Sequence, residues 1–347
     1  MKKHRPEIYE QAKHALLIED FVVFRLTGKA QIDHSIAART MAFDIRKLDW
    51  SEEIFQAAGI DKSLMSQPVP TGTKAGKILL EIAEITGLSI NTEIVSISHD
   101  QVAAAVGAGV FGSDKAADGA GTVQCLIPVY DGIPETDEMY QGNYALVPYV
   151  ISGKYVAYAY SYTGGALLQW CVETLAKKEK ELAEEQGISV NEYLEGSFTE
   201  PTGLLVLPHF AGAGTPYMDN GSKGAIVGLT TSSTVSDIYR ACMESVVYEE
   251  LVNLERLKAT GVRINMMHAT GGGAKSEVWM QMKADILDIP MTALATADAG
   301  TVGSAMLTGI AIGCFEDLED AALHMVEKRK VYESNLLCRI WSGKVSF

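Results

Sequence analysis

Two short runs of this 347-residue chain carry groups that could transfer a phosphoryl group to an alcohol. The first is His99-Asp100-Gln101, in which a carboxylate able to take a proton from a hydroxyl lies between an imidazole and an amide. The second is the turn Gly119-Ala120-Gly121-Thr122, whose backbone N–H groups could approach a phosphate. The spacing between the two runs leaves room for one helix and a return into the turn.

Each run also has an ordinary structural explanation. An aspartate directly after a strand is most often the N-cap of the next helix. A lone Gly-Ala-Gly-Thr sequence is most often a hairpin turn. The order of the two runs favours the chemical interpretation, as do the glycine turns further along the chain, and the structural interpretation stays open.

The acidic composition narrows the classes of partner. The chain carries a formal net charge of −15 and 47% hydrophobic residues. An acidic surface repels nucleic acid and anionic membranes, so neither is expected as the main partner. An anionic ligand would need local help from helix N-termini, glycine turns or a bound cation. The length and the hydrophobic content allow a large core and favour two domains.

Cysteine, histidine and apolar patterns predict a cytoplasmic protein without a metal site of its own. The five cysteines are scattered and form no CxxC pair, which is typical of reduced thiols. The seven histidines form no pair with metal-ligand spacing, so no metal-ligating residue is predicted. No apolar run reaches 18 residues, and the start MKKHRPEIYE lacks the apolar region of a signal peptide. We therefore expect neither a membrane span nor a leader.

Hydrophobic periodicity predicts strands that alternate with helices. Segment 93–98 is apolar and β-branched enough for a buried strand, and an Ala-rich helix over 101–110 follows it. Asp100 would then lie at the carboxyl end of a strand, where α/β proteins place their ligands. The other predicted helices are 6–26 with Gly28 ending it, 51–59 with Ser51 as N-cap, 78–86, one carrying Gln169, 177–186, 236–259, 276–287 and 301–312. The other predicted strands are 123–128, 144–151, 155–160, 204–207, 225–229 and 265–269. A turn with a short helix is expected over 31–40, and a connector over 67–72.

Three glycine-rich turns recur in the second part of the chain, at 119–122, 163–165 and 271–273. Each would offer free N–H groups, and a helix that follows such a turn adds the positive end of its dipole. One such turn could serve only to pack a helix on a sheet, but three favour a nucleotide site. Neither a GxGxxG nor a GxxxxGK[ST] motif is present, so Rossmann dehydrogenases and P-loop enzymes are not indicated.

As a set, the motifs resemble the FGGY family of carbohydrate kinases, in the actin-like sugar-kinase superfamily. The similar runs are LLIEDFVVFRLTG (16–28), SIAARTMAFDIRKLDWSEE (35–53), HDQVAAAVGAGV (99–110), DGAGT (118–122), TGGALLQW (163–170), LPHFAGAGTPYMDNGSKGAIVGL (207–229) and the glycine-rich run 269–287. The resemblance extends from about Arg5 to about Tyr332. It implies an α/β protein with the actin-like ATPase (ribonuclease H-like) fold.

The resemblance also implies an activity and a set of roles. The reaction would be transfer of the γ-phosphoryl of ATP to a hydroxyl of a sugar, ketose, polyol or sugar acid, with Mg²⁺ bridging the phosphates. Asp100 would be the general base, and His99 and Gln101 would lie beside the substrate. The nucleotide contacts would be Gly121 and Thr122 at the phosphates, Gly165 and Gln169 along the nucleotide, and Gly273 and Glu277 at the adenosine. Alternatively, Gln169 is plain helix surface, and Glu277 is favoured in a first helical turn without any ligand.

The departures from the family pattern predict an incomplete first domain. The chain lacks an opening strand with an Asp-x-Gly-Thr phosphate loop, and its end, SNLLCRIWSGKVSF (334–347), is unlike the family's tail. We expect a partial N-terminal domain over 1–98 and a complete nucleotide-binding C-terminal domain over 99–347. Apolar side chains around Phe21, Val22 and Phe24 would then be exposed. A homodimer or a complementing N-terminal fragment could cover them.

A second function therefore stays open. The chain could be a catalytically incomplete fragment that binds a nucleotide or a partner chain. The sequence does not identify the sugar, since the residues that would select it lie largely in the part of the pattern that this chain lacks.

Overall fold

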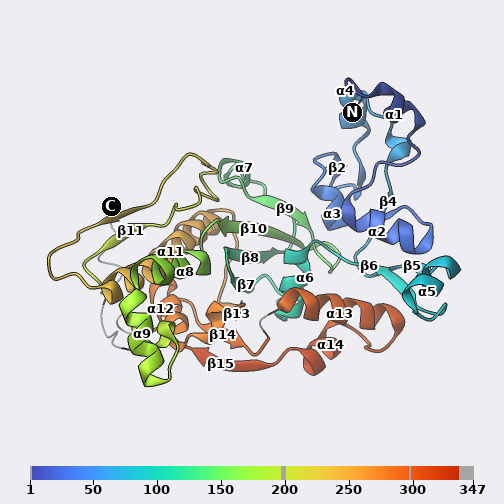
Figure 1. Cartoon of the computed structure of the whole chain (residues 1–347). Coiled ribbons are helices and arrows are strands. Elements are labelled where there is room, and N and C mark those ends of the chain that lie inside the picture. Colours follow the sequence, from blue (N-terminus) through green and yellow to red (C-terminus); the bar gives the residue numbers. More distant parts are fainter. Residues whose placement is uncertain (1, 197–200, 297, 336–347) are drawn as a thin grey trace. The chain divides into compact units, whose positions relative to one another are not determined.

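The computed structural model describes residues 2–196, 201–296 and 298–335. The chain divides into two units, which are described separately below (Figure 1). Unit 1 comprises Met1–Gly107, Val147–Tyr155 and Gly300–Met325, and unit 2 comprises Ala108–Leu146, Val156–Ala299 and Val326–Phe347. The predicted boundary between residues 98 and 99 stays a prediction.

Unit 1 is built from short helices and two-stranded sheets. Strand β1 pairs with β4 in parallel, and the β2–β3 and β5–β6 pairs are antiparallel. Its helices are α1 (Pro6–Gln11), α2 (Ile18–Thr27), α3 (His34–Ala38), α4 (Glu52–Ala58), the 3-10 turn η1 (Lys62–Leu64), α5 (Leu80–Thr86), α6 (Asp100–Gly107), α13 (Ala299–Ile312) and α14 (Leu318–Met325). Its strands are β1 (Gln31–Asp33), β2 (Phe43–Asp44), β3 (Asp49–Trp50), β4 (Gln67–Val69), β5 (Thr73–Lys77) and β6 (Glu93–Ser96).

The predicted helix 6–26 is wrong in its middle. The backbone leaves the helical region at Ala12, with ψ of 132°, and the chain re-enters a helix only at Ile18. Between the two helices, Ala15 N–H donates to Leu64 O at 2.8 Å. This hydrogen bond to a distant residue takes the place of a helical hydrogen bond, and the local sequence pattern does not reveal it. The predicted end is confirmed, since Gly28 ends α2 with φ of +78°.

Two segments predicted to lack strands form the β1–β4 pair. Gln31 pairs with Gln67, and Asp33 pairs with Val69. The hydrophobic pattern does not reveal these strands because each has only three residues, and β4 contains a proline, which marks an edge position.

The helix predicted after Ser51 is confirmed, since the Ser51 hydroxyl accepts from Ile54 N–H and Gly59 ends the helix.

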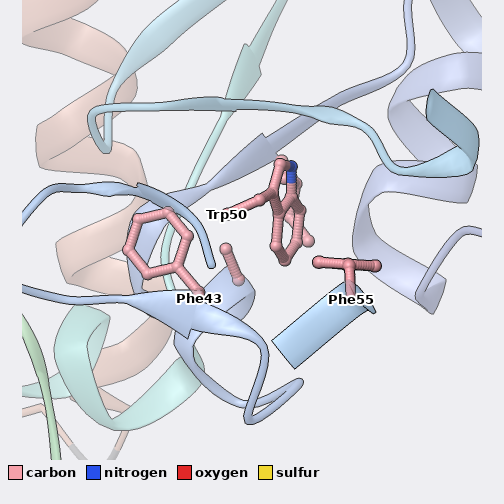
Figure 2. Packing of buried hydrophobic residues seen from close by; sticks show 5 residues of the cluster. Phe43, Trp50 and Phe55 are labelled. Atoms are coloured by element: carbon pink, nitrogen blue, oxygen red, sulfur yellow. The ribbon is translucent and has the colours of Figure 1, made fainter. Parts of the chain in front are cut away.

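An aromatic cluster forms a core of unit 1 (Figure 2). The rings of Phe43 and Trp50 meet edge to face, with centroids 5.8 Å apart. Phe55 meets the other side of Trp50 at 5.9 Å. The indole N–H of Trp50 donates to Ser66 O at 2.8 Å, so its polar atom is satisfied inside the core. The packing thus adds to the β2–β3 pairing, in which Phe43 and Trp50 are direct partners, and both fix the segment between β2 and α4.

Unit 2 is organised around a seven-stranded mixed sheet with the strand order β15-β14-β13-β7-β8-β10-β9 (Figure 1). Strands β7, β13 and β14 run parallel, whereas β8 is antiparallel to β7 and β15 is antiparallel to β14. The sheet strands are β7 (Lys115–Ala120), β8 (Gln124–Tyr130), β9 (Ala145–Pro148), β10 (Tyr155–Ser161), β13 (Met266–Thr270), β14 (Met291–Leu294) and β15 (Lys328–Tyr332). The β9–β10 hairpin is predicted correctly, but its tip is grouped with unit 1.

Helices of unit 2 pack on one another beside this sheet, and α11 contacts α8, α10 and α12. The helices are α7 (Glu138–Gln141), α8 (Gly165–Leu175), α9 (Lys177–Gln186), α10 (Val190–Glu195), α11 (Val235–Ala259), the 3-10 turn η2 (Gly273–Lys275) and α12 (Glu277–Leu287). The long helix α11 and the helix α12 are predicted to within a few residues, and a helix that carries Gln169 is confirmed as α8. A capping box at Thr234 and Asp237 begins α11.

One strand of unit 2 is predicted with the wrong environment. Segment 204–207 is expected to be a buried strand, but β11 (Leu205–Leu207) pairs only with β12 (Ala225–Val227) in a ribbon of two strands. The side chains of Leu205 and Leu207 are more than 40% exposed. The apolar run is misleading because apolar residues alone do not show whether a second layer covers a strand.

Within the described ranges, no helix is both long and apolar enough to cross a membrane. Cys125, Cys171 and Cys242 are buried and Cys314 is exposed, and none of these four cysteines forms a disulfide with another described residue. Cys338 and most of the unusual tail, residues 336–347, lie outside the described residues.

Candidate functional site

The run His99-Asp100-Gln101 lies where β6 passes into α6, as predicted. The approach to α6 is held by buried polar contacts, since His99 N–H donates to Ser35 Oγ at 2.9 Å. Ser35 Oγ donates in turn to Asp33 Oδ1 at 2.5 Å. The buried Asp33 carboxylate also accepts from Ile36 N–H at 2.8 Å and from the Thr71 hydroxyl. Two distant segments thereby fix the backbone of the run.

The Asp100 carboxylate is the exposed end of this arrangement. Its side chain is 77% exposed, and its Oδ1 lies 2.9 Å from His99 Nδ1. Gln101 N–H also donates to this oxygen at 2.7 Å. The hydrogen bond from His99 is the largest cause that lowers the pKa of Asp100. The carboxylate is therefore ionised at neutral pH and can accept a proton.

The capping geometry does not account for Asp100. It is the first residue of α6, and the turn is closed by Ala103 N–H, which donates to His99 O at 3.0 Å. The carboxylate accepts from its neighbour Gln101, whereas a capping side chain accepts from an N–H two or three residues further along. The capping position belongs to His99.

Asp100 and His99 lie on an open apolar groove of about 950 Å³ within unit 1, called the α2–β6 groove below. The groove is lined by Leu17, Ile18, Glu19, Val22, Val23, Leu26, Ile36, Arg39, Ile94, Val95, Ile97, His99 and Asp100. The expectation that 93–98 is a buried strand is wrong, because only Ser96 of β6 is fully buried. The apolar side chains of β6 face the groove instead of a second layer.

The predicted exposure around α2 is confirmed for two of the three residues. Phe21 and Val22 are 46% and 48% exposed, and Ile18 is 81% exposed. Phe24 is only half-buried, since its ring packs against His14 with centroids 5.0 Å apart. The exposed apolar side chains of α2 lie beside the groove that contains Asp100.

The groove also contains an acidic group in an unfavourable environment. Both carboxylate oxygens of Glu19 are buried, and neither has a hydrogen-bond partner among the described residues. Burial, and then the nearby Asp33 and Asp20 carboxylates, raise the pKa of Glu19 to about 8. The folded state therefore prefers the protonated side chain, whereas the unfolded chain ionises near the ordinary value.

We expect Glu19→Gln to stabilise unit 1 at alkaline pH. Because the pKa is raised in the folded state, the stability that the protonated group contributes is lost as pH rises from about 4.5 through about 8. After discounting by about half for solvent access, the gain at pH 9 is about 2 kcal/mol. Urea unfolding at pH 5, 7 and 9 measures it, with Glu84→Gln on the exposed face of α5 as the control. An equal effect of Glu19→Gln at all three pH values would contradict the assignment.

In unit 2 the glycine turns converge on the tip of the β7–β8 hairpin. The hairpin interpretation of 118–122 is confirmed, since β7 and β8 pair up to Ala120 and Gln124. Gly165 N–H donates to Gly121 O at 2.8 Å, and Gly164 N–H donates to Thr122 O at 3.0 Å. The structure therefore brings Gly121, Thr122 and Gly165 together.

The third glycine turn packs on the same hairpin tip. A Cβ on Gly271, where φ is +94°, would lie 2.6 Å from Ala120 O. A Cβ on Gly273 would lie 3.0 Å from the Ala120 methyl and 2.5 Å from the Trp279 ring. Both positions need glycine because backbone and ring approach so closely. We call the three turns together the glycine cradle.

One expectation about the cradle is wrong. The N–H groups of the second turn are expected to be free, but those of Gly164, Gly165 and Ala166 all donate to carbonyls of Gly121 and Thr122. This turn thus holds the first turn in place and does not offer these N–H groups to a ligand.

The two predicted nucleotide side chains lie on helix surfaces. Gln169 is exposed on α8 and donates to Glu173 on the next turn at 2.8 Å. Glu277 is exposed at the start of α12, where Lys330 Nζ donates to it at 2.6 Å and lowers its pKa. No contact to the cradle is found for either side chain within the described residues, so their roles stay predictions.

The predicted site residues thus form two groups. His99, Asp100 and Gln101 belong to unit 1, and the glycine cradle with Gln169 and Glu277 belongs to unit 2. Domain models of one family cover both groups. The FGGY family of carbohydrate kinases, N-terminal domain, matches residues 1–107, and its C-terminal domain matches residues 123–312. The chain belongs to the FGGY family of carbohydrate kinases.

Relatives within the family agree with this assignment. A xylulose kinase of Bacillus subtilis is 27% identical over 335 residues, which are 96% of this chain and 65% of the relative. A glycerol kinase of Carboxydothermus hydrogenoformans is 31% identical over 90% of this chain and 60% of the relative. The chain therefore spans less than two thirds of the length of these two relatives.

Solved structures show the same fold. A ligand-bound xylulose kinase of Lactobacillus acidophilus superposes with a TM-score of 0.85 and 24% identity. The superposition covers 99% of this chain and 68% of that one. The FGGY chain thus has the actin-like ATPase fold, with α/β architecture, as the motifs predicted.

Some residues of the site are not predicted from the sequence. Arg39 lines the same groove as His99 and Asp100, and Ser35 and Asp33 hold the backbone of the run. All three lie in the polar segment 31–40, whose pattern indicates only a turn with a short helix. In the sequence, the only feature that could have indicated their role is the number of polar side chains in so short a segment.

Proposed function

We propose that this FGGY chain supports ATP-dependent transfer of a phosphoryl group to a hydroxyl of a sugar, ketose, polyol or sugar acid. The observation that carries the proposal is the exposed, ionised Asp100 carboxylate on the α2–β6 groove, at the start of α6. A carboxylate in this state can take the proton from an attacking hydroxyl. The xylulose and glycerol kinases among the relatives support a small polyhydroxylated acceptor.

Unit 2 would hold the nucleotide at the glycine cradle. In this proposal Gly121 and Thr122 contact the phosphates, Gly273 lies toward the adenosine, and Gly165 keeps the hairpin tip in place. Gln169 and Glu277 would line the nucleotide from the helix surfaces. Mg²⁺ would enter with ATP and neutralise charge on its phosphates, as phosphoryl transfer generally requires. The division into a partial substrate-side domain, 1–98, and a nucleotide-binding domain, 99–347, stays a prediction, and the run His99-Asp100-Gln101 lies at its boundary.

The α2–β6 groove is proposed to be covered in the working protein. Its walls are apolar, its helix α2 is exposed, and the matched relatives extend well beyond the part that aligns with this chain. A complementing N-terminal segment is one occupant, and a second copy of this chain is the other. Neither nucleic acid nor a membrane is proposed as a partner, because the net charge is −15. A cytoplasmic location belongs to the same proposal.

The test is ADP release by the purified chain with MgATP and a panel of sugars, polyols and sugar acids. Acceptor-dependent ADP release, together with a phosphorylated product found by mass spectrometry, is the expected result. Nucleotide binding without turnover on any acceptor would instead favour a catalytically incomplete fragment. ADP release that is independent of the acceptor would contradict the alcohol as phosphoryl acceptor.

A further inference from the structure

A lysine is buried completely beneath the glycine cradle. Lys283 of α12 has no exposed side-chain surface, and its ammonium makes three hydrogen bonds. Two go to Asp118, at 2.9 Å to Oδ1 and 2.7 Å to Oδ2, and one goes to Glu250 Oε2 at 2.8 Å. All three ammonium protons are thereby used. We call Lys283, Asp118 and Glu250 the Lys283 cluster.

The Lys283 cluster joins three elements that shape the cradle. Asp118 directly precedes Gly119 in β7, so its position fixes the hairpin that carries Gly121 and Thr122. Lys283 lies on α12, the helix that follows the glycine turn 271–273. Glu250 comes from the middle of α11. A single ammonium thus connects the β7–β8 hairpin to the helix behind the third turn.

Neighbouring side chains complete the enclosure of this charge. The Gln124 amide, from β8, donates to Asp118 Oδ1. The Trp279 ring, which fills the space beside Gly273, lies 5.6 Å from Lys283 Nζ. The cluster and the third glycine turn therefore share one packing contact. If Lys283 were displaced, the Trp279 ring would shift and change the packing beside Gly273.

Such a cluster is an unusual way to hold a core together. Two carboxylates and one ammonium leave a surplus negative charge, and burial raises the pKa of Glu250 to about 7. Apolar residues of the same volume would often be at least as stabilising as buried charges. Ionic groups instead give directed contacts of defined length, which restrict a turn to one position. The cradle needs this restriction, since Ala120 O would lie only 2.6 Å from a Cβ on Gly271.

We propose that Lys283 is a positioning residue for nucleotide binding, which fixes the β7–β8 hairpin and the third glycine turn in one arrangement by binding Asp118 and Glu250 together. This inference rests on the proposed nucleotide site in unit 2. Lys283 itself is buried and does not touch the ligand. Its effect is on affinity for the nucleotide, because binding groups that are not held in the bound arrangement must be ordered when the ligand binds, which costs binding free energy.

The experiment is calorimetric titration of MgADP into the wild-type chain and into Lys283→Met. The matched control is Lys258→Met, which removes an exposed lysine from the last turn of α11. We expect the Kd of Lys283→Met to rise at least about tenfold, at a temperature where circular dichroism shows a folded chain. The Kd of Lys258→Met should stay within about twofold of wild type, the scatter of such titrations.

A double variant covers the case in which Lys283→Met does not fold. Asp118→Asn combined with Lys283→Met removes one of the two carboxylates that Lys283 compensates, and the other, Glu250, can take up a proton because burial raises its pKa. The double variant is therefore expected to fold while the connection between hairpin and helix stays broken. Weak MgADP binding by the folded double variant supports the positioning role. Wild-type affinity in either folded variant would overturn it and leave Lys283 a structural residue. Failure of the wild-type chain to bind MgADP would instead overturn the proposed nucleotide site.

Discussion

Replacing Asp100 with asparagine is expected to lower kcat for acceptor phosphorylation by about 10²- to 10⁴-fold, the usual contribution of a general base. The amide keeps the size of the side chain and its hydrogen bond from Gln101 N–H, but it has no lone pair basic enough to take the hydroxyl proton. The coupled ADP-release assay used for the acceptor panel measures the loss.

The effect of Asp100→Asn should be confined to the chemical step. The variant is expected to bind MgADP as the wild type does, because the glycine cradle belongs to unit 2 and Asp100 to unit 1. Glu93→Gln, at the start of β6, removes a carboxylate from the strand that precedes α6 and serves as the control. If Asp100→Asn kept wild-type kcat, Asp100 would not be the base.

Gly303→Ala is the substitution that we expect to be most destructive to unit 1. A Cβ on Gly303 of α13 would lie 1.9 Å from Ala103 O and 2.8 Å from Gly107 N, both on α6. Neither backbone atom can move away from the added Cβ unless the whole of α6 moves. We expect a loss of about 2 to 3 kcal/mol in the free energy of unfolding, after the helix propensity gained by alanine is subtracted.

A glycine on the same helix provides the matched control. A Cβ on Gly309 would meet the ring of Phe315, which can swing away, rather than backbone. Gly309→Ala should therefore cost clearly less than Gly303→Ala in urea unfolding. Because α6 begins at Asp100, Gly303→Ala should also reduce turnover at temperatures where the chain is still folded. Equal unfolding free energies of the two variants would contradict the close contact of α13 with α6.

The sequence predicts the positions of helices and strands better than it predicts which of their faces other elements cover. Ser51 and Gly59, at the ends of α4, act through bonds only a few residues long, so local patterns reveal them. Burial of β6 and β11, predicted from apolar composition, is wrong for both strands, because composition does not say what lies opposite a strand. The break between α1 and α2 is associated with the hydrogen bond from Ala15 N–H to Leu64 O, and Leu64 is distant in the sequence.

The same limit applies to the candidate site. The spacing of Asp100 and the glycine turns is visible in the sequence and is sufficient to suggest phosphoryl transfer. The hydrogen bonds from Gly164 and Gly165 to the hairpin, and the Lys283 cluster, instead join segments that are far apart in the sequence. A lysine in an amphipathic helix gives no local sign that it is buried, so only the fold reveals it.

The most direct test of the central claim, a nucleotide site in unit 2 of an FGGY kinase chain, is calorimetric titration of MgADP into the purified protein, followed by thermal unfolding at increasing MgADP. We predict saturable binding, a midpoint of unfolding that rises with MgADP concentration, and the same affinity in Asp100→Asn. No heat of binding together with an unchanged midpoint would contradict both the kinase function and the nucleotide-binding alternative for this chain.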